Sequence, residues 1–220
     1  MEFINQFVEL FLHLDDHLAN VVSEYGPAIY IILFLIIFCE TGLVVTPILP
    51  GDSLLFAAGS MAAIGALNAH GLFVLLTVAA ILGDTVNYVI GRKLGTAAFV
   101  KYPKIFRPEY LEKTQRFYAK YGGKTIIIAR FVPIVRTFAP FVAGVGAMNY
   151  GRFIMFNVVG GIVWVSVLVY AGFFFGNIPV VKDHFELVIL GIIFLSILPP
   201  IIEFAKHHFG TKASRNAKVP

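Results

Sequence analysis

The sequence is poor in charge and in cysteine. Only 14% of its 220 residues are charged, whereas 58% are hydrophobic and 15% are aromatic, and the mean hydropathy is +0.83. A soluble domain typically carries about a quarter charged residues, so this composition predicts an integral membrane protein. The single cysteine, Cys39, excludes an internal disulfide and any metal site built from several cysteines. No long polar linker divides the chain, which indicates one membrane domain.

Basic residues are missing from the first part of the chain. No Lys or Arg precedes Arg92, nine lie between Arg92 and Lys124, and four follow from Lys206 onward. Basic loops stay on the cytoplasmic side of a membrane, so the loop 92–124 and the tail 206–220 are predicted to be cytoplasmic. A basic balance is also typical of nucleic-acid binding. Here the basic residues flank membrane segments, so no nucleic-acid partner is expected.

Residues 1–24 place apolar side chains at helical spacing, with acidic residues mostly on the other faces. This pattern predicts an amphipathic helix on the membrane surface. A short helix packed on the other helices, without lipid contact, is the alternative. His13 and His17 lie one helical turn apart, but no further ligand is in view, so no metal site is predicted.

The rest of the chain, from 25 to about 205, is predicted to form the membrane domain. A span needs about 20 apolar residues. The stretches that meet or approach this length are 27–46, 72–91, 153–175 and 187–204. A polar helix is predicted for 109–121, ended by the Gly122-Gly123 pair. Gly172 and Gly176 are spaced for close contact with another helix.

Two further apolar stretches, 47–66 and 125–146, are interrupted by helix-breaking residues. These residues are Pro47, Pro50 and Gly51 in the first stretch and Pro133 and Pro140 in the second. Broken backbone at membrane depth is tolerated only where protein or a wet cavity surrounds it, so both stretches are predicted to be re-entrant hairpins.

The positions of the basic regions agree with re-entry. If 125–146 crossed the membrane completely, the basic tail 206–220 would lie on the outer face, against the distribution rule for Lys and Arg. If it enters from the cytoplasm and returns, hairpin 47–66 enters from the outer side and the two hairpins face each other. Opposed repeats with broken helices are typical of transporters that bind substrate near the midplane. The predicted fold is therefore all-helical, with an inverted repeat.

Four charged residues, Glu40, Asp52, Arg130 and Arg136, fall in hydrophobic surroundings at the hairpins. Buried charges need partners, so two internal ion pairs are one interpretation. A substrate site is the other, because ionisable residues within a membrane are functional by default. The planar guanidinium groups of Arg130 and Arg136 suit a phosphate head group. The carboxyl groups of Glu40 and Asp52 suit proton uptake and release coupled to transport.

Asp84, Asn87 and Tyr88 form a secondary group of candidate site residues within the span 72–91. Capping or hydrogen bonding of Asp84 to its two polar neighbours is the alternative interpretation.

Three motifs occur along the chain, and their joint spacing is specific. They are Phe38-x-Glu40 with Pro47-x-x-Pro50-Gly51-Asp52-Ser53-Leu54-Leu55, Gly83-Asp84-x-x-x-Tyr88-x-x-Gly91-Arg92, and Arg130-Phe131-x-Pro133-x-x-Arg136-x-x-x-Pro140-x-x-Ala143-Gly144. Together they resemble the signatures of the DedA family of bacterial inner-membrane proteins. The resemblance implies an all-helical fold with two opposed re-entrant hairpins, shared with eukaryotic lipid scramblases of the VTT group. By position, Glu40 and Asp52 match the family's essential acids, and Arg130 and Arg136 match its essential arginines.

The resemblance also implies proton-motive-force-dependent transport and a role in envelope integrity, since family members are implicated in returning undecaprenyl phosphate across the membrane. The predicted function is a flippase of undecaprenyl phosphate or a related anionic lipid. Its partners would be that lipid and protons, with no cofactor and no metal. Two alternatives stay open, a proton-coupled cation antiporter and an intramembrane lipid-phosphate enzyme. The second lacks a convincing histidine nucleophile near the hairpins, so the protein is not expected to be an enzyme. The oligomeric state is left open, a homo-oligomer included.

Overall fold

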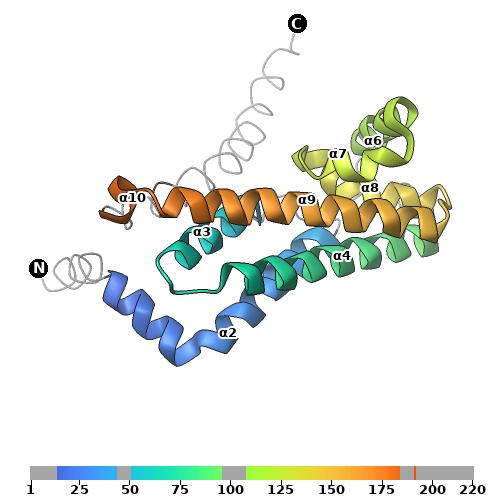
Figure 1. Cartoon of the computed structure of the whole chain (residues 1–220). Coiled ribbons are helices and arrows are strands. Elements are labelled where there is room, and N and C mark those ends of the chain that lie inside the picture. The colour runs from blue at the N-terminus through green and yellow to red at the C-terminus, as the bar shows by residue number, and fades with distance from the viewer. Residues whose placement is uncertain (1–13, 44–50, 96–107, 184–190, 192–220) are drawn as a thin grey trace, which may run out of the picture.

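The computed structural model describes residues 14–43, 51–95, 108–183 and 191, and every regular element in these ranges is a helix (Figure 1). In chain order they are α2 (Leu14–Gly42), α3 (Gly51–Ala63), α4 (Ala69–Leu94), α6 (Pro108–Tyr121), the 3₁₀ helix η1 (Gly122–Lys124), α7 (Thr125–Ala129), α8 (Pro133–Val145), α9 (Tyr150–Gly176) and α10 (Pro179–Asp183). The predicted all-helical class is confirmed. The predictions for residues 1–13, Pro47, Pro50, the span 187–204 apart from Gly191, and the tail 206–220 lie outside the described residues.

Two long helices, α4 and α9, form the centre of the molecule (Figure 1). Both are long and apolar enough to cross a membrane, and they contain the predicted spans 72–91 and 153–175. They run antiparallel, because His70 at the start of α4 contacts Tyr170 near the end of α9, while Tyr88 stacks on Phe153 at the other end.

Asparagine begins both long helices. The side chain of Asn68 accepts a hydrogen bond from the backbone N–H of Gly71, and that of Asn149 accepts one from Arg152. Each bond satisfies a backbone donor that the first turn of a helix leaves free. At the other end of α4, Arg92 and Lys93 lie in the last turn, where cations favour the helix dipole.

Helices α3 and α8 are short and lie on opposite halves of the central pair. Each has 13 residues and is therefore about 20 Å long, too short to cross a hydrocarbon core of about 30 Å. Helix α3 packs along the second half of α9, and α8 packs on the second half of α4. Both helices begin where Asp52 meets Arg136 and run away from that point in opposite directions. Re-entry into a membrane and an inverted repeat stay predictions.

Glycines allow the short helices to approach the long ones closely. A Cβ atom at Gly172 of α9 would lie 2.0 Å from the carbonyl oxygen of Phe56 in α3. One at Gly176 would lie 2.9 Å from that of Ser60, so the predicted role of Gly172 and Gly176 in close helix contact is confirmed. On the other side, a Cβ atom at Gly91 would lie 2.2 Å from the carbonyl oxygen of Phe141 in α8.

The structure differs from the sequence prediction at Pro140, which was expected to interrupt the second hairpin. It lies inside α8, and the break occurs instead at 130–132, just before Pro133. Proline suits the first position of a helix because it lacks a backbone N–H, and an N–H at that position would have no partner within the helix. Pro133 occupies that position. Gly51, expected to break the first hairpin, is the first residue of α3.

The N-terminal part of the described chain also differs from the expected division at residue 24. Helix α2 continues from Leu14 to Gly42 with Pro27 inside it, and it is visibly bent (Figure 1). A proline within a helix is a common cause of such a bend. The predicted helix 109–121 is confirmed as α6, and Gly122 follows it with a φ of 57°.

Apolar side chains also cover the outside of the long helices. Exposed examples are Val74, Val78, Leu82, Val86 and Val89 on α4 and Met155, Val159, Ile162, Val163 and Val167 on α9. Exposed apolar surface of this extent is unusual for a soluble monomer and suits contact with lipid.

Candidate functional site

Arg136 lies at the meeting point of three helices. It is the fourth residue of α8, and its Nη2 donates a hydrogen bond to Oε1 of Glu40 near the end of α2. Its Nη1 donates to Oδ1 of Asp52, the second residue of α3, over 2.6 Å. Glu40 and Arg136 are 1% and 9% exposed, whereas the side chain of Asp52 is 52% exposed. This group of ion pairs is therefore buried on one side and open on the other.

Trp164 of α9 contacts the same group. Its Nε1 donates a hydrogen bond to Oδ1 of Asp52 over 2.9 Å. The ring centroid lies 5.2 Å from Cζ of Arg136 and 5.6 Å from Cζ of Arg130, both within the range of cation–π attraction. Arg136, Glu40, Asp52 and Trp164 are named the Arg136 cluster below.

Arg130 belongs to a second group of polar side chains. Directly after α7, its Nη2 donates to Oδ2 of Asp84 in α4 over 2.5 Å and to Oδ1 of Asn157 in α9 over 2.6 Å. The side chains of Arg130 and Asp84 are 2% and 3% exposed. Asn157 in turn donates from Nδ2 to the carbonyl oxygen of Ile81. Arg130, Asp84 and Asn157 are named the Arg130 cluster.

The Arg130 guanidinium has hydrogen-bonding capacity to spare. Within the described ranges, its buried Nε and Nη1 find no hydrogen-bond partner. The backbone of α9 passes close by, since a Cβ atom at Gly160 would lie 3.1 Å from Nε. The stacked Trp164 ring covers part of the same group. Two guanidinium donors are thus enclosed without a protein acceptor, which is uncommon for buried polar atoms.

Gly51 leaves room for the carboxylate of Glu40. A Cβ atom on Gly51 would lie 1.6 Å from Oε2 of Glu40, so no other residue fits at the start of α3 without moving that carboxylate. Because Gly51 has no side chain, the carboxylate of Glu40 has room to lie against both α3 and Arg136.

Asn87 and Tyr88, the secondary candidates, hold helices together. Nδ2 of Asn87 donates to the carbonyl oxygens of Thr41 in α2 and Thr137 in α8, over 3.1 and 2.9 Å. The hydroxyl of Tyr88 donates to the carbonyl oxygen of Met148. Their neighbour Asp84, by contrast, belongs to the Arg130 cluster.

The structure thus brings Glu40, Asp52 and Arg136 together but pairs Arg130 with Asp84. Sequence reasoning missed Asn157 and Trp164 as members of the site. A signal existed, because two residues seven positions apart lie on one face of a helix, and both place a side-chain N–H donor within an apolar span. Among the residues that the structure describes, no group of three or more His, Cys, Asp or Glu side chains could hold a metal ion.

Comparisons with known proteins agree with this picture. The VTT domain matches residues 49–174. Protein DedA of Escherichia coli K12 is 57% identical over 221 residues, which cover 99% of this chain and 100% of that protein. Uncharacterized membrane protein Rv0364 of Mycobacterium tuberculosis H37Rv is 42% identical over 88% of this chain and 85% of its own. Inner membrane protein YqjA of Escherichia coli K12 is 38% identical over 82% of each chain.

No solved structure shows a significant match to the chain. The domain match spans more than half of the sequence, and the identity to three named relatives extends over most of each chain. Two of these relatives are described by name as membrane proteins, in agreement with the long apolar helices α4 and α9. The chain is therefore a membrane protein that belongs to the DedA family of VTT-domain proteins.

Proposed function

We propose that this protein moves an anionic lipid across the bacterial inner membrane, driven by the proton motive force, and thereby supports envelope integrity. The lipid we propose is undecaprenyl phosphate or a close relative. The observation that carries the proposal is the buried Arg136 guanidinium, held by two carboxylates of which one, Asp52, is half exposed.

The ion-pair geometry suits exchange with a phosphate. Arg136 presents one nitrogen to each carboxylate, and a guanidinium binds phosphoryl oxygens in the same forked way. Asp52 is the exposed partner, so an arriving head group can replace it without opening the buried contact between Arg136 and Glu40. The lipid tail would stay beside the apolar outer faces of α4 and α9.

Proton coupling follows from the same exchange. The arriving phosphate would bring negative charge beside Glu40 and Asp52, and a nearby like charge favours proton binding by a carboxylate. Asp52, and Glu40 behind it, would therefore take up protons as the phosphate binds Arg136 and release them as it leaves. This links lipid movement to the proton gradient without a cofactor.

A flipping assay in reconstituted vesicles tests the proposal. Arg136→Ala should slow the transbilayer movement of a labelled polyprenyl phosphate by at least about tenfold, the loss expected for one charge-assisted contact. Arg116→Ala is the matched control, because this arginine is 78% exposed on α6 and its ion-pair partner among the described residues is Glu112, also at the surface. An Arg136→Ala protein that flips the lipid as fast as the control contradicts the proposal.

A proton-coupled cation antiporter is the second candidate. It is favoured by the three carboxylates of the two clusters, Glu40, Asp52 and Asp84, which could exchange a proton for a cation. Vesicles without polyprenyl phosphate separate the two functions. Sodium or potassium flux that Asp52→Asn abolishes would identify an antiporter, whereas the lipid transporter requires the labelled lipid for any movement.

We also propose that the two hairpins are re-entrant and that the C-terminus is cytoplasmic, as in an inner-membrane protein. Since Cys39 is the single cysteine, a Cys39→Ser protein gives a clean background for labelling in intact cells. An impermeant thiol reagent should label Ile64→Cys from outside, but Lys113→Cys and Lys212→Cys only after the cells are opened. Labelling of Lys212→Cys from outside would contradict this topology.

A further inference from the structure

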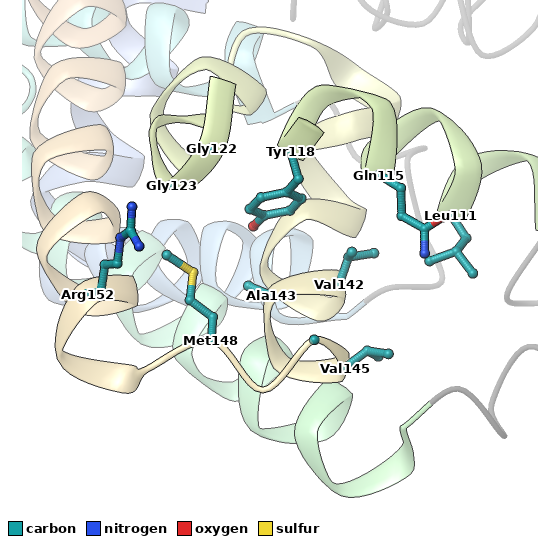
Figure 2. A pocket seen from close by; sticks show the side chains of 11 residues that line it. Leu111, Gln115, Tyr118, Gly122, Gly123, Val142, Ala143, Val145, Met148 and Arg152 are labelled. Atoms are coloured by element: carbon teal, nitrogen blue, oxygen red, sulfur yellow. The ribbon is translucent and has the colours of Figure 1, made fainter. Parts of the chain in front are cut away.

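A cavity of about 490 Å³ lies apart from both charged clusters, between α6, η1, the end of α8 and the start of α9 (Figure 2). Its walls are largely apolar, with Leu111 on α6 facing Val142, Val145 and Met148. Figure 2 shows Met148 and Arg152 on one side of the space and Leu111 and Gln115 on the other. A volume of this size falls in the usual range for small-molecule sites, roughly 300–1,000 Å³.

Among the described residues, Arg152 is the single charged residue that lines the cavity. It is exposed and, within the described residues, has no ion-pair or hydrogen-bond partner for its guanidinium. Arg152 is the third residue of α9, where the positive end of the helix dipole disfavours a cation. An arginine in this position raises the positive potential at the cavity instead of stabilising its own helix.

Helix α6 adds to that potential. Its buried or half-buried positions Leu111, Thr114, Phe117 and Tyr118 recur at helical spacing and face α8, where the Tyr118 hydroxyl donates to the carbonyl oxygen of Ala139. Its exposed face carries Lys113 and Lys120, together with Arg116, whose charge is paired with Glu112. Basic residues beside a membrane attract anionic lipid by roughly 1 kcal/mol each.

We propose that this cavity is a binding site for an anionic lipid, distinct from the Arg136 cluster. One hydrocarbon chain lies along the apolar wall formed by Leu111, Val142 and Val145, and the phosphate of the head group binds the guanidinium of Arg152. A lipid is the occupant that fits, because the walls offer contact to an alkyl chain and Arg152 at the rim supplies a cation that pairs with no described residue. Among the described residues, no acidic side chain lines the cavity to repel the head group.

The site does not depend on the proposed transport function. Val145 lies nine residues after Arg136 on α8, a separation of about 14 Å along the helix. The cavity wall contains none of the four residues of the Arg136 cluster. Binding in the cavity and transport through the cluster can therefore be tested, and can fail, separately.

Photocrosslinking to the full-length protein in nanodiscs tests the site. The probe is a phosphatidic acid with a diazirine in one acyl chain, and its matched control is the uncharged diacylglycerol with the same chain. Crosslinks are mapped by mass spectrometry of peptides. We expect the phosphatidic acid to label the peptides that contain Leu111 and Met148 in preference to those from the outer faces of α4 and α9.

Variants separate a real site from general lipid contact. Val145→Trp and Gln115→Trp fill the cavity from opposite walls, so each should reduce labelling at Leu111 and Met148 by both probes. Arg152→Gln should weaken labelling by phosphatidic acid by about tenfold, as expected for one charge-assisted contact, and leave the diacylglycerol unchanged. Arg136→Ala should change neither, and Arg116→Gln is the control for a surface charge on α6.

Three results would overturn the proposal. The first is undiminished labelling in either tryptophan variant, provided that the unfolding temperature of that variant matches the parent protein. The second is an equal loss for Arg116→Gln and Arg152→Gln, which would mean general attraction to a basic surface. The third is equal labelling over the outer faces of α4 and α9, which would mean that the lipid only surrounds the protein. Because either tryptophan variant alone suffices, failure of one to fold leaves the test intact.

Discussion

The Arg130 and Arg136 clusters use the same chemistry in two different settings. The arginines are six residues apart, each pairs with a carboxylate, and both contact the ring of Trp164. In the Arg130 cluster both partners are 2–3% exposed, and a buried asparagine adds a third contact. In the Arg136 cluster one of two carboxylates, Asp52, is 52% exposed.

This difference in exposure indicates different roles. The buried Arg130 cluster suits a structural role, whereas the half-exposed carboxylate of the Arg136 cluster can be replaced by a ligand. Breaking a buried ion pair leaves an uncompensated charge in the interior, so the Arg130 cluster resists opening. An exposed carboxylate can move into water at little cost. We therefore propose that the Arg130 cluster is structural and holds α4, α7 and the neighbouring α9 in place. The Arg136 cluster is, in this proposal, the group that binds substrate.

The largest expected effect is on stability. Asp84→Leu strands the buried Arg130 and should lower the free energy of unfolding by about 3–5 kcal/mol, whereas Asp52→Leu should cost about 1 kcal/mol or less. Thermal unfolding in detergent micelles compares the two. The double variant Asp84→Leu/Arg130→Met should regain much of the loss, because both charges are gone. Equal destabilisation by the two single variants would remove the distinction between the clusters.

The next effect concerns the fit of Glu40 against α3. Gly51→Ala places a Cβ atom 1.6 Å from Oε2 of Glu40, so the carboxylate must move away from Arg136. Overpacking of this kind costs about 1–3 kcal/mol, and we expect slower lipid flipping together with a lower unfolding temperature. Gly71→Ala is the control, because its nearest neighbour would be 3.4 Å away. If Gly51→Ala behaves like Gly71→Ala, the position of Glu40 is not critical.

Trp164 allows the hydrogen bond and the ring contact to be separated. Trp164→Phe removes the N–H donated to Asp52 but keeps a ring beside both guanidinium groups. We expect the loss of this hydrogen bond to cost about 1 kcal/mol, which would slow lipid flipping several-fold. Trp164→Leu should cost more in stability because it also removes the cation–π contacts. Identical unfolding temperatures for the two variants would show that the ring contributes nothing beyond its N–H.

The smallest expected change in stability comes from breaking a surface ion pair. Arg116 and Glu112 form an ion pair one helical turn apart on α6, with side chains 78% and 65% exposed. Glu112→Ala should change stability by only about 0.3–0.5 kcal/mol. Salt should remove this difference, which a repeat of the unfolding measurement in high salt would detect. A larger effect would mean that surface ion pairs cannot serve as the reference for the buried clusters.

Hydrophobic length predicted much of the fold. The helices at 72–91, 109–121 and 153–175 follow from local composition. The sequence prediction gathered Glu40, Asp52, Arg130 and Arg136 at the hairpins but did not say which of them pair. The partner of Arg130 could not be predicted, because it depends on how α4 and α9 align. That antiparallel alignment brings Asp84 and Asn157 to one point from 73 residues apart. Local rules also failed to predict that α8 continues through Pro140, because the packing of the helix maintains it there.

The measurement that tests the central claim most directly is a density map of the protein with a polyprenyl phosphate bound. We expect the phosphate on Arg136, with the carboxylate of Asp52 turned away and the contact between Arg130 and Asp84 unchanged. A phosphate bound to Arg130 with Asp84 released, or a head group that touches neither arginine, would contradict it.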